Sequence, residues 1–502
     1  MTTTPDTARL ANCPPLETAV IGFVLGFRGE MLTPALKLAV SRVLRDQFSS
    51  QVGNSRLPWS RQARALIDAH HVAGRSRIVT SQATVSAVDA AFINATFAHG
   101  FEYDEGHRPS NSHPGSCVVA TAVAVGEEVG ATLDEIVTAV LMGYEVYARL
   151  GVLAAPDLIQ RGFHPAGVLA SFGAAAVTAR LRGFDAETTL HAMAIALSHA
   201  SGALECSSSG GSVKRVHPGI GVRGGMMAAQ LAQAGITGPR AFLSGVRGFY
   251  KAFLQRGPAE DASQRFAFDA RFEIFRGGYK RYCCCGANHA SVDILAAYAP
   301  QLGEIETVTL RIPKLVNGMV GLANAGVYTP GNIEQVQFSL PVQAAFALLG
   351  IGNGYGAHLG YLEGTVDMAR VGTVARMVQL VEDTGLDQQY PGKFVTEATV
   401  RFKDGRTESR FVENSVGTPD NPMTDEVHDL KFMELAAPVL GEPRSRQLLD
   451  VLHRLPGDLP VSELTRLCAI YNSDGGGAPA QAPSTGRWCS GHSILTTERW
   501  RP

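Results

Sequence analysis

Helical periodicity over the first half of the chain is the feature that most restricts its fold. Between Leu16 and about residue 256, apolar residues recur at the i, i+3, i+4 spacing of amphipathic α-helices. Clear examples are 36–44 and 136–146, and Thr132 with Glu135 forms a capping-box pair before the second. Further helices are predicted at 83–100, 116–129, 166–181, 185–201 and 221–235. Because these segments are rich in Ala and Gly, the pattern predicts a closely packed helical bundle.

The pattern changes after about residue 270, where strand-like segments appear. Residues 306–312 alternate and end at Pro313, and 396–402 and 406–412 flank a Lys-Asp-Gly turn, as in a β-hairpin. Helices are expected nearby at 341–349, 373–381, 425–440, 443–455 and 461–471. We therefore expect an α+β region. From Asn472 onward the chain is rich in Gly, Pro, Ser and Ala, which predicts a flexible tail.

The charge composition argues against several classes of partner. The 502 residues include 44 Lys+Arg and 46 Asp+Glu without a basic run, which disfavours a surface for nucleic acid or an anionic membrane. The apolar stretches 164–179 and 335–362 are too short or too rich in Gly and polar residues to span a membrane. With no secretory signal at the N-terminus, a cytoplasmic location is expected. The charged fraction of 18% is below the usual value of roughly 25%, which favours burial between subunits.

Cysteine and glycine patterns predict no metal, disulfide or nucleotide site. The eight cysteines lack paired CxxC spacing, and the run Cys283-Cys284-Cys285 is expected to have a packing role. The spacing of His107 and His113 matches no zinc signature, although a site built from them and an acid is conceivable. No GxxxxGK[ST] motif is present.

Two polar segments at predicted helix starts carry candidate catalytic residues. Residues 99–116 join two helices and hold several histidines and three carboxylates, and His113 precedes a proline, which favours an extended backbone. Taken alone, this segment is equally compatible with a solvated connection or with helix capping. His164 lies at the start of the next Ala-rich helix, where the helix dipole favours a neutral imidazole and a nearby anion.

Two further segments carry cations. Residues 207–219 deliver Lys214, Arg215 and His217 just before a helix expected to begin near Ile220. Residues 278–289 hold Lys280 and, beyond the cysteines, a further histidine at the junction of the two regions, where ligand sites are common. Each segment is a weak indication by itself. Together the four predict a site for a small polyanion.

The same segments resemble the motifs of one enzyme family. They are Phe97-Ala-His-Gly-Phe-Glu-Tyr-Asp-Glu with His113-Pro-Gly-Ser, Gly143-Tyr-Glu-Val, Gly162-Phe-His-Pro, Lys214-Arg-Val-His-Pro-Gly, Lys280-Arg-Tyr with His289, and Gln337-Phe-Ser-Leu. In this order they resemble the MmgE/PrpD family, which includes 2-methylcitrate dehydratase, cis-aconitate decarboxylase and iminodisuccinate epimerase. The resemblance spans about residues 15–470.

The resemblance implies a mainly α fold in which a large helical domain is completed by both ends of the chain. We place this domain at 1–270 with 415–470, an inserted α+β lid at 271–414, and the tail at 471–502. It also implies a homodimer, a small anionic carboxylic-acid substrate, and no metal or organic cofactor.

The resemblance assigns site residues at the matching positions. The expected catalytic group is His113, His164, Asp104 and His107, and the expected substrate-binding group is Lys214, Lys280, Arg215 and His289. One departure concerns the family's Asp-aromatic-Asp-Asp-Thr run, which is Glu102-Tyr-Asp104-Glu105-Gly106 here.

These residues are suited to removing a group or a proton next to a carboxylate. Lysines can stabilise the enolate-like charge, and a histidine can transfer the proton. A cofactor-independent lyase for a 2-methylcitrate- or cis-aconitate-like acid is our first interpretation. An epimerase or isomerase of a small dicarboxylate such as iminodisuccinate is the second, and a non-catalytic binding protein is the third.

Overall fold

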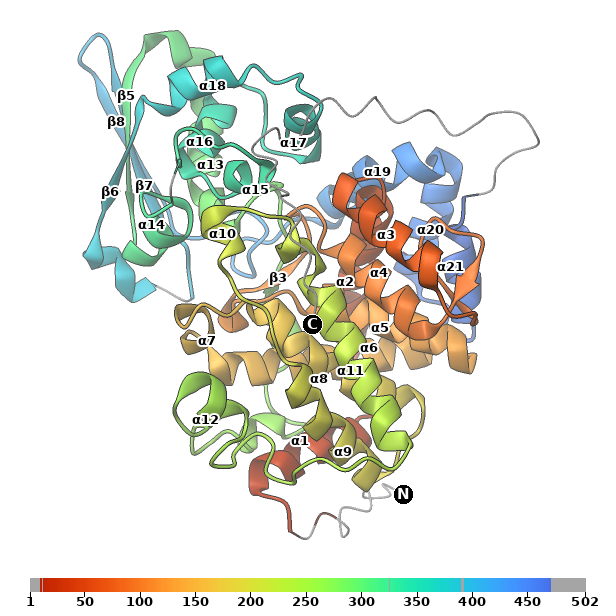
Figure 1. Ribbon diagram of the computed structural model, residues 1–502. Helices are drawn as coiled ribbons and strands as arrows, with labels where there is room; N and C mark the ends of the chain where they lie inside the picture. Colours follow the sequence, from red (N-terminus) through yellow and green to blue (C-terminus); the bar gives the residue numbers. More distant parts are fainter. Residues whose placement is uncertain (1–9, 11, 325, 390–391, 471–502) are drawn as a thin grey trace, which may run out of the picture. The chain divides into compact units, whose positions relative to one another are not determined.

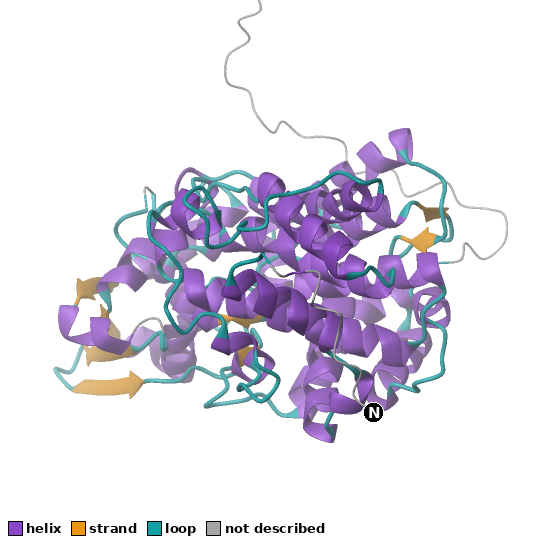
Figure 2. Cartoon of the chain, turned by 90° about the horizontal axis from the view of Figure 1, so that it is seen from below, coloured by secondary structure: helices purple, strands orange, loops and turns teal. Residues whose placement is uncertain are grey.

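Helices form most of the protein in the computed structural model, which describes residue 10 and residues 12–324, 326–389 and 392–470 (Figure 1). The described residues up to 469 form one compact unit. Strands are few, and the cartoon in Figure 2 shows most of them gathered at one side of the helices. The expected mainly α fold is therefore confirmed, whereas the predicted tail at 471–502 lies outside the described residues.

The first twelve helices form the helical part of the protein, and small residues allow them to pack closely. Helix α8 is buried almost throughout and packs against α5, α6, α9 and α11. A Cβ atom added at Gly221 of α11 would lie only 2.6 Å from the Cβ of Ala170 in α8, so this crossing requires glycine. The twelve helices are α1 (Pro15–Gly26), α2 (Pro34–Asn54), α3 (Pro58–His70), α4 (Ala87–Ala98), α5 (Pro114–Val129), α6 (Leu133–Ala154), α7 (Asp157–Gln160), α8 (Pro165–Leu181), α9 (Ala186–Ala196), α10 (Cys206–Ser209), α11 (Val213–Gln233) and α12 (Phe249–Leu254).

Helix α6 shows how local sequence and burial agree. The predicted capping box is present, since the backbone N–H of Thr132 donates to Glu135 at 2.8 Å. Among the described residues α6 alone is long and apolar enough to cross a membrane, but 94% of its most apolar window is buried inside the protein. This burial is typical of a core helix.

The start of α11 differs from the prediction. The helix begins at Val213 rather than near Ile220, so Lys214, Arg215 and His217 belong to its first two turns instead of a flexible loop. Pro218 lies inside this helix. A proline this close to the helix start removes only one intrahelical hydrogen bond, and burial of the first turns outweighs that loss.

The α+β region contains a four-stranded sheet of order β6-β5-β7-β8 (Figure 1). The predicted strand and hairpin are confirmed as β5 (Ile305–Ile312), β7 (Thr396–Phe402) and β8 (Thr407–Val412). The predicted helix at 373–381 is wrong in its second half, because β6 (Val378–Glu382) pairs in parallel with β5. The helices of this region are α13 (His289–Leu295), α14 (Lys314–Val320), α15 (Ile333–Gln337), α16 (Leu340–Leu348), α17 (Tyr355–Leu362) and α18 (Met368–Ala375).

The chain then returns to the helical part through α19 (Asp425–Leu440), α20 (Glu442–Arg454) and α21 (Val461–Leu467). Helix α19 packs along α2, and Asp425 bonds both Arg42 at 3.0 Å and Arg45 at 2.8 Å. The described part of the chain up to residue 469 is one compact unit, so the division into a helical domain and a lid stays a prediction.

Two short strand pairs lie within the helical part. One joins β1 (Ser76–Arg77) and β2 (Thr84–Val85), and the other joins β3 (Gly106–His107) and β4 (Gly277–Gly278). In the second pair His107 lies opposite Gly277, and Gly106 opposite Gly278. This pairing places the polar segment 99–116 beside the segment that carries Lys280, although 178 residues separate Glu102 from Lys280 in sequence.

Candidate active site

A cavity of about 910 Å³ brings the predicted polar segments together. Six of the eight predicted site residues line it: His107, His113, His164, Lys214, Lys280 and His289. His113 and His164 are the N-cap residues of α5 and α8, each followed by a proline at the first helical position. Lys214 comes from the first turn of α11, and His289 begins α13.

The cations at this cavity surround one carboxylate. Glu102 forms ion pairs with Lys214, with Lys280 at 2.9 Å and with Arg215 at 3.5 Å. Burial alone would raise the pKa of Glu102, but the three cations hold it well below its usual range. Its backbone has a φ of 56°, which is uncommon for a residue other than glycine and is maintained here by the surrounding contacts. Three cations around one anion leave positive charge for an anionic ligand.

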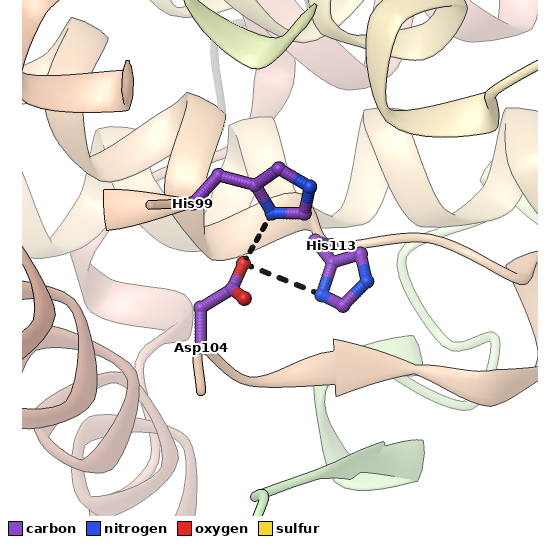
Figure 3. A group of neighbouring side chains, drawn as sticks. All are labelled: His99, Asp104 and His113. Atoms are coloured by element: carbon purple, nitrogen blue, oxygen red, sulfur yellow. Dashed lines mark hydrogen bonds and ion pairs between the residues drawn. The ribbon is translucent and has the colours of Figure 1, made fainter. Parts of the chain in front are cut away.

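Asp104 holds two histidines in a triad, shown in Figure 3. Its Oδ2 atom lies 2.8 Å from Nδ1 of His99 and 3.3 Å from Nδ1 of His113. Nδ1 of His113 also lies 2.7 Å from the carbonyl oxygen of Glu105. A carbonyl only accepts, so Nδ1 of His113 carries the hydrogen and Nε2 is the basic atom. Burial would raise the pKa of Asp104, but His113 and His99 lower it well below its usual range, and the residue is an anion.

His99 connects this triad to the cations. Its Nε2 lies 3.4 Å from Nζ of Lys214, which donates because an ammonium has no acceptor. Burial lowers the pKa of His99 to about 3, so the ring is neutral at physiological pH. The neutral ring donates to Asp104 and accepts from Lys214, which fixes the position of both partners.

His164 is paired with another histidine. Its Nδ1 atom lies 2.9 Å from Nδ1 of His217 in α11, and its ring centroid lies 5.6 Å from that of His99. Burial, followed by the charge of Lys214, lowers the pKa of His164 well below the usual value. A neutral imidazole at a helix start agrees with the prediction from the helix dipole.

Three predicted site residues have contacts that bear on their expected roles. Both ring nitrogens of His107 are engaged, Nδ1 with Ser110 at 2.9 Å and Nε2 with Glu273 at 3.1 Å, so we assign it a structural role. Arg215 is fully buried outside the cavity lining and bonds Gln337, so it supports Glu102 from behind instead of reaching a ligand. Asp104 is also outside the lining, as expected for a residue that orients a histidine.

Sequence reasoning missed His99, Gln337 and Lys431 as supports of the site. Gln337 donates to the carbonyl oxygens of Phe101 and Cys283 at 2.9 Å each. Lys431 of α19 is buried and donates to Asp46 at 2.7 Å, to the carbonyl of Tyr103 at 2.6 Å and to that of Lys280 at 3.1 Å. His99 and Gln337 lie in segments that the sequence singled out, but neither residue was named as a candidate. Nothing near Lys431 in the sequence signals its role, because its partners are up to 385 residues away.

The buried imidazole of His289 is expected to make the stability of the protein depend on pH. Burial lowers its pKa to about 3, and its Nε2 has no hydrogen-bond partner among the described residues. Below pH 6.5 the unfolded chain binds a proton at this position and the folded protein does not, so acid removes stability. The free energy of unfolding of the wild type minus that of His289→Asn should therefore decrease by about 1.4 kcal/mol for each pH unit below pH 6.5. Above about pH 7 this difference should stay constant. Urea unfolding of both proteins at several pH values measures this difference, and a pH-independent difference would contradict it.

One group of side chains has metal-ligand chemistry. Single atoms of His99, Asp104 and His113 all lie within 4.8 Å of one another. The two Nδ1 atoms already bond Asp104 directly, so hydrogen bonds account for the arrangement. The sulfur atoms do not add to this group, since Cys283, Cys284 and Cys285 are free thiols and Cys283 donates to the carbonyl of Phe101 at 2.8 Å.

Comparison with known proteins identifies the family of the chain. Residues 19–261 match the MmgE/PrpD N-terminal domain, and residues 282–455 match the MmgE/PrpD C-terminal domain. A cis-aconitate decarboxylase of Aspergillus terreus is 25% identical over 82% of this chain and 87% of its own length. A cis-aconitate decarboxylase-like protein of Aspergillus oryzae is 26% identical over 85% and 91%, and a cis-aconitate decarboxylase of Mus musculus is 25% identical over 75% and 78%. Since the two domain matches cover most of the sequence, the chain belongs to the MmgE/PrpD family of enzymes.

Proposed function

We propose that the protein is a lyase that removes water or CO₂ from a small di- or tricarboxylic acid resembling 2-methylcitrate or cis-aconitate. The observation that carries the proposal is the single cavity that holds Lys214 and Lys280 together with His113. The relatives named as cis-aconitate decarboxylases support a lyase reaction on a carboxylic acid. We also propose that the enzyme is a cytoplasmic homodimer without a nucleic-acid or membrane partner.

The proposed chemistry follows from the charges at the cavity. Lys214 and Lys280 bind substrate carboxylates and stabilise the enolate charge that develops when a proton or CO₂ leaves. Burial would lower the pKa of Lys280, but Glu102 and Asp104 raise it above its usual value, so this residue stays a cation. The positive charge is therefore in place before the substrate binds.

Proton transfer is assigned to His113. Its hydrogen on Nδ1 is directed at the carbonyl of Glu105, and Asp104 stabilises the imidazolium when Nε2 takes a proton. In a dehydration the same group can pass the proton to the leaving hydroxyl, and in a decarboxylation it can give the carbon that loses CO₂ a proton taken up from water. We assign His164 as its partner on the cavity wall.

An epimerase is the second candidate, because His113 and His164 border the same cavity from the starts of two different helices. Two such groups can remove and return a proton from different directions. NMR product analysis in D₂O with citrate, 2-methylcitrate, cis-aconitate and iminodisuccinate separates the reactions. Loss of water or CO₂ supports the lyase, deuterium exchange without loss supports the epimerase, and no change in any acid contradicts both.

Metal removal tests the proposal that no cofactor is needed. Exhaustive dialysis against a chelator is expected to leave kcat unchanged, because Oδ2 of Asp104 already bonds the Nδ1 atoms of His99 and His113. The measurement is the initial rate of the substrate found in the NMR panel, before and after dialysis. A loss of activity that added Zn²⁺ restores would show that the triad holds a metal.

A further inference from the structure

The cavity is larger than the proposed small acid requires. Its volume of about 910 Å³ lies near the upper end of the roughly 300–1,000 Å³ that hold drug-sized ligands. Lys214 and Lys280 lie in one part of it, around Glu102. A six-carbon acid bound there leaves much of the cavity unfilled, so the chemistry of the remaining wall indicates what else the substrate carries.

An apolar wall begins directly beside the cations. The ring of Phe338, which lines the cavity, lies with its centroid 5.4 Å from Nζ of Lys214. Asn324 connects the backbones of Phe338 and Met319. Its side-chain amide donates to the carbonyl oxygen of Met319 at 2.7 Å and lies 3.4 Å from that of Phe338. The side chains of Phe338 and Met319 therefore belong to the same cavity lining, and Asn324 connects their backbones.

Helix α14 extends this wall. Leu315, Gly318 and Met319 all line the cavity, and their i, i+3, i+4 spacing places them on one face of the helix. A Cβ atom added at Gly318 would meet no atom within 4 Å, so the helix faces open space at this position. The missing side chain widens the cavity where its wall is apolar.

We propose that the substrate is a polycarboxylate that carries an alkyl chain of several carbons. Its carboxylates bind Lys214 and Lys280, and its chain lies along Phe338, Met319 and Leu315 beside Gly318. This inference rests on the proposed function for the carboxylate end of the substrate. It adds an apolar substituent that the cations and histidines alone do not require.

The expected effect is large enough to measure. Each buried methylene contributes about 0.8 kcal/mol, which corresponds to about fourfold in affinity, and incomplete burial reduces this to about two- to threefold. Hexylsuccinate should therefore bind about 50-fold or more tightly than succinate, with butylsuccinate between them. Isothermal calorimetry with these unreactive acids measures the effect without any turnover.

A bulkier residue at Gly318 tests the location of the chain. Gly318→Leu should remove most of the gain from succinate to hexylsuccinate while it leaves the affinity for succinate within about twofold. Gly356→Leu is the matched control, because Gly356 also lies in an exposed part of a helix with no atom within 4 Å of an added Cβ, but outside the cavity lining. This control should keep the full chain-length dependence.

The outcomes separate this inference from the proposed function. Equal affinity for the three succinates, or the same loss in both glycine variants, would overturn the inference. Turnover of a short acid together with equal affinities would leave the lyase proposal intact. Chain-length dependence without turnover of any short or alkyl-substituted citrate would instead support the apolar site and contradict the lyase.

Discussion

Alanine at His113 is expected to lower kcat by about 10³-fold, within the range of about 10²–10⁴ that general acid–base groups contribute. The variant removes the only group of the Asp104 triad whose ring lines the cavity. Lys214, Lys280 and Glu102 remain, so the substrate should still bind and KM should change little. Initial rates from NMR product analysis, measured over a range of substrate concentrations, separate the two constants.

His191→Ala provides the matched control for this prediction. The side chains of His191 and His113 are 18% and 16% exposed, and both contact a carboxylate, but His191 is outside the cavity lining. Activity of this variant should equal that of the wild type. A tenfold rise in KM at constant kcat in His113→Ala would show that His113 binds substrate and another group transfers the proton.

Local signals explain why part of the site was predictable. His113 and His164 each precede a proline, and a residue before proline is biased away from the helix, so both were expected at helix starts. The cations near residues 214 and 280 were recognised by their sequence context. The capping residues Thr132 and Glu135 act within four positions of each other, and such short-range contacts can be read from sequence.

Contacts between distant segments explain what the sequence did not reveal. Strand β6 forms because it pairs in parallel with β5. The local pattern of residues 373–381 is helical and contains no information about this pairing. Histidine is a common catalytic residue, but Nε2 of His107 is bonded to Glu273, which lies 166 positions away in the sequence. Lys431 gives no signal for the same reason, since its three partners come from α2 and two distant loops.

The role of Glu102 provides the second large prediction. Glu102→Gln keeps the side-chain shape but leaves Lys214, Lys280 and Arg215 without their shared anion. The free energy of unfolding should fall by about 3–5 kcal/mol, the usual cost of breaking a buried ion pair by removing one partner. Citrate should raise Tm more in this variant than in the wild type, because a bound carboxylate replaces the lost charge. Thermal and urea unfolding with and without citrate measure both effects.

Glu306→Gln tests whether the loss at Glu102 reflects burial. Glu306 pairs with Arg401 at 2.9 Å, but the side chains are 48% and 60% exposed, so its replacement should change stability by less than about 1 kcal/mol. A similarly small loss in Glu102→Gln, with equal effects of citrate on variant and wild type, would show that the three cations do not depend on this carboxylate. A larger loss of stability in Glu102→Gln, with stronger rescue by citrate, would instead show that Glu102 occupies part of an anion site. The carboxylates of the substrate would then neutralise the positive charge that Glu102 alone leaves on the three cations.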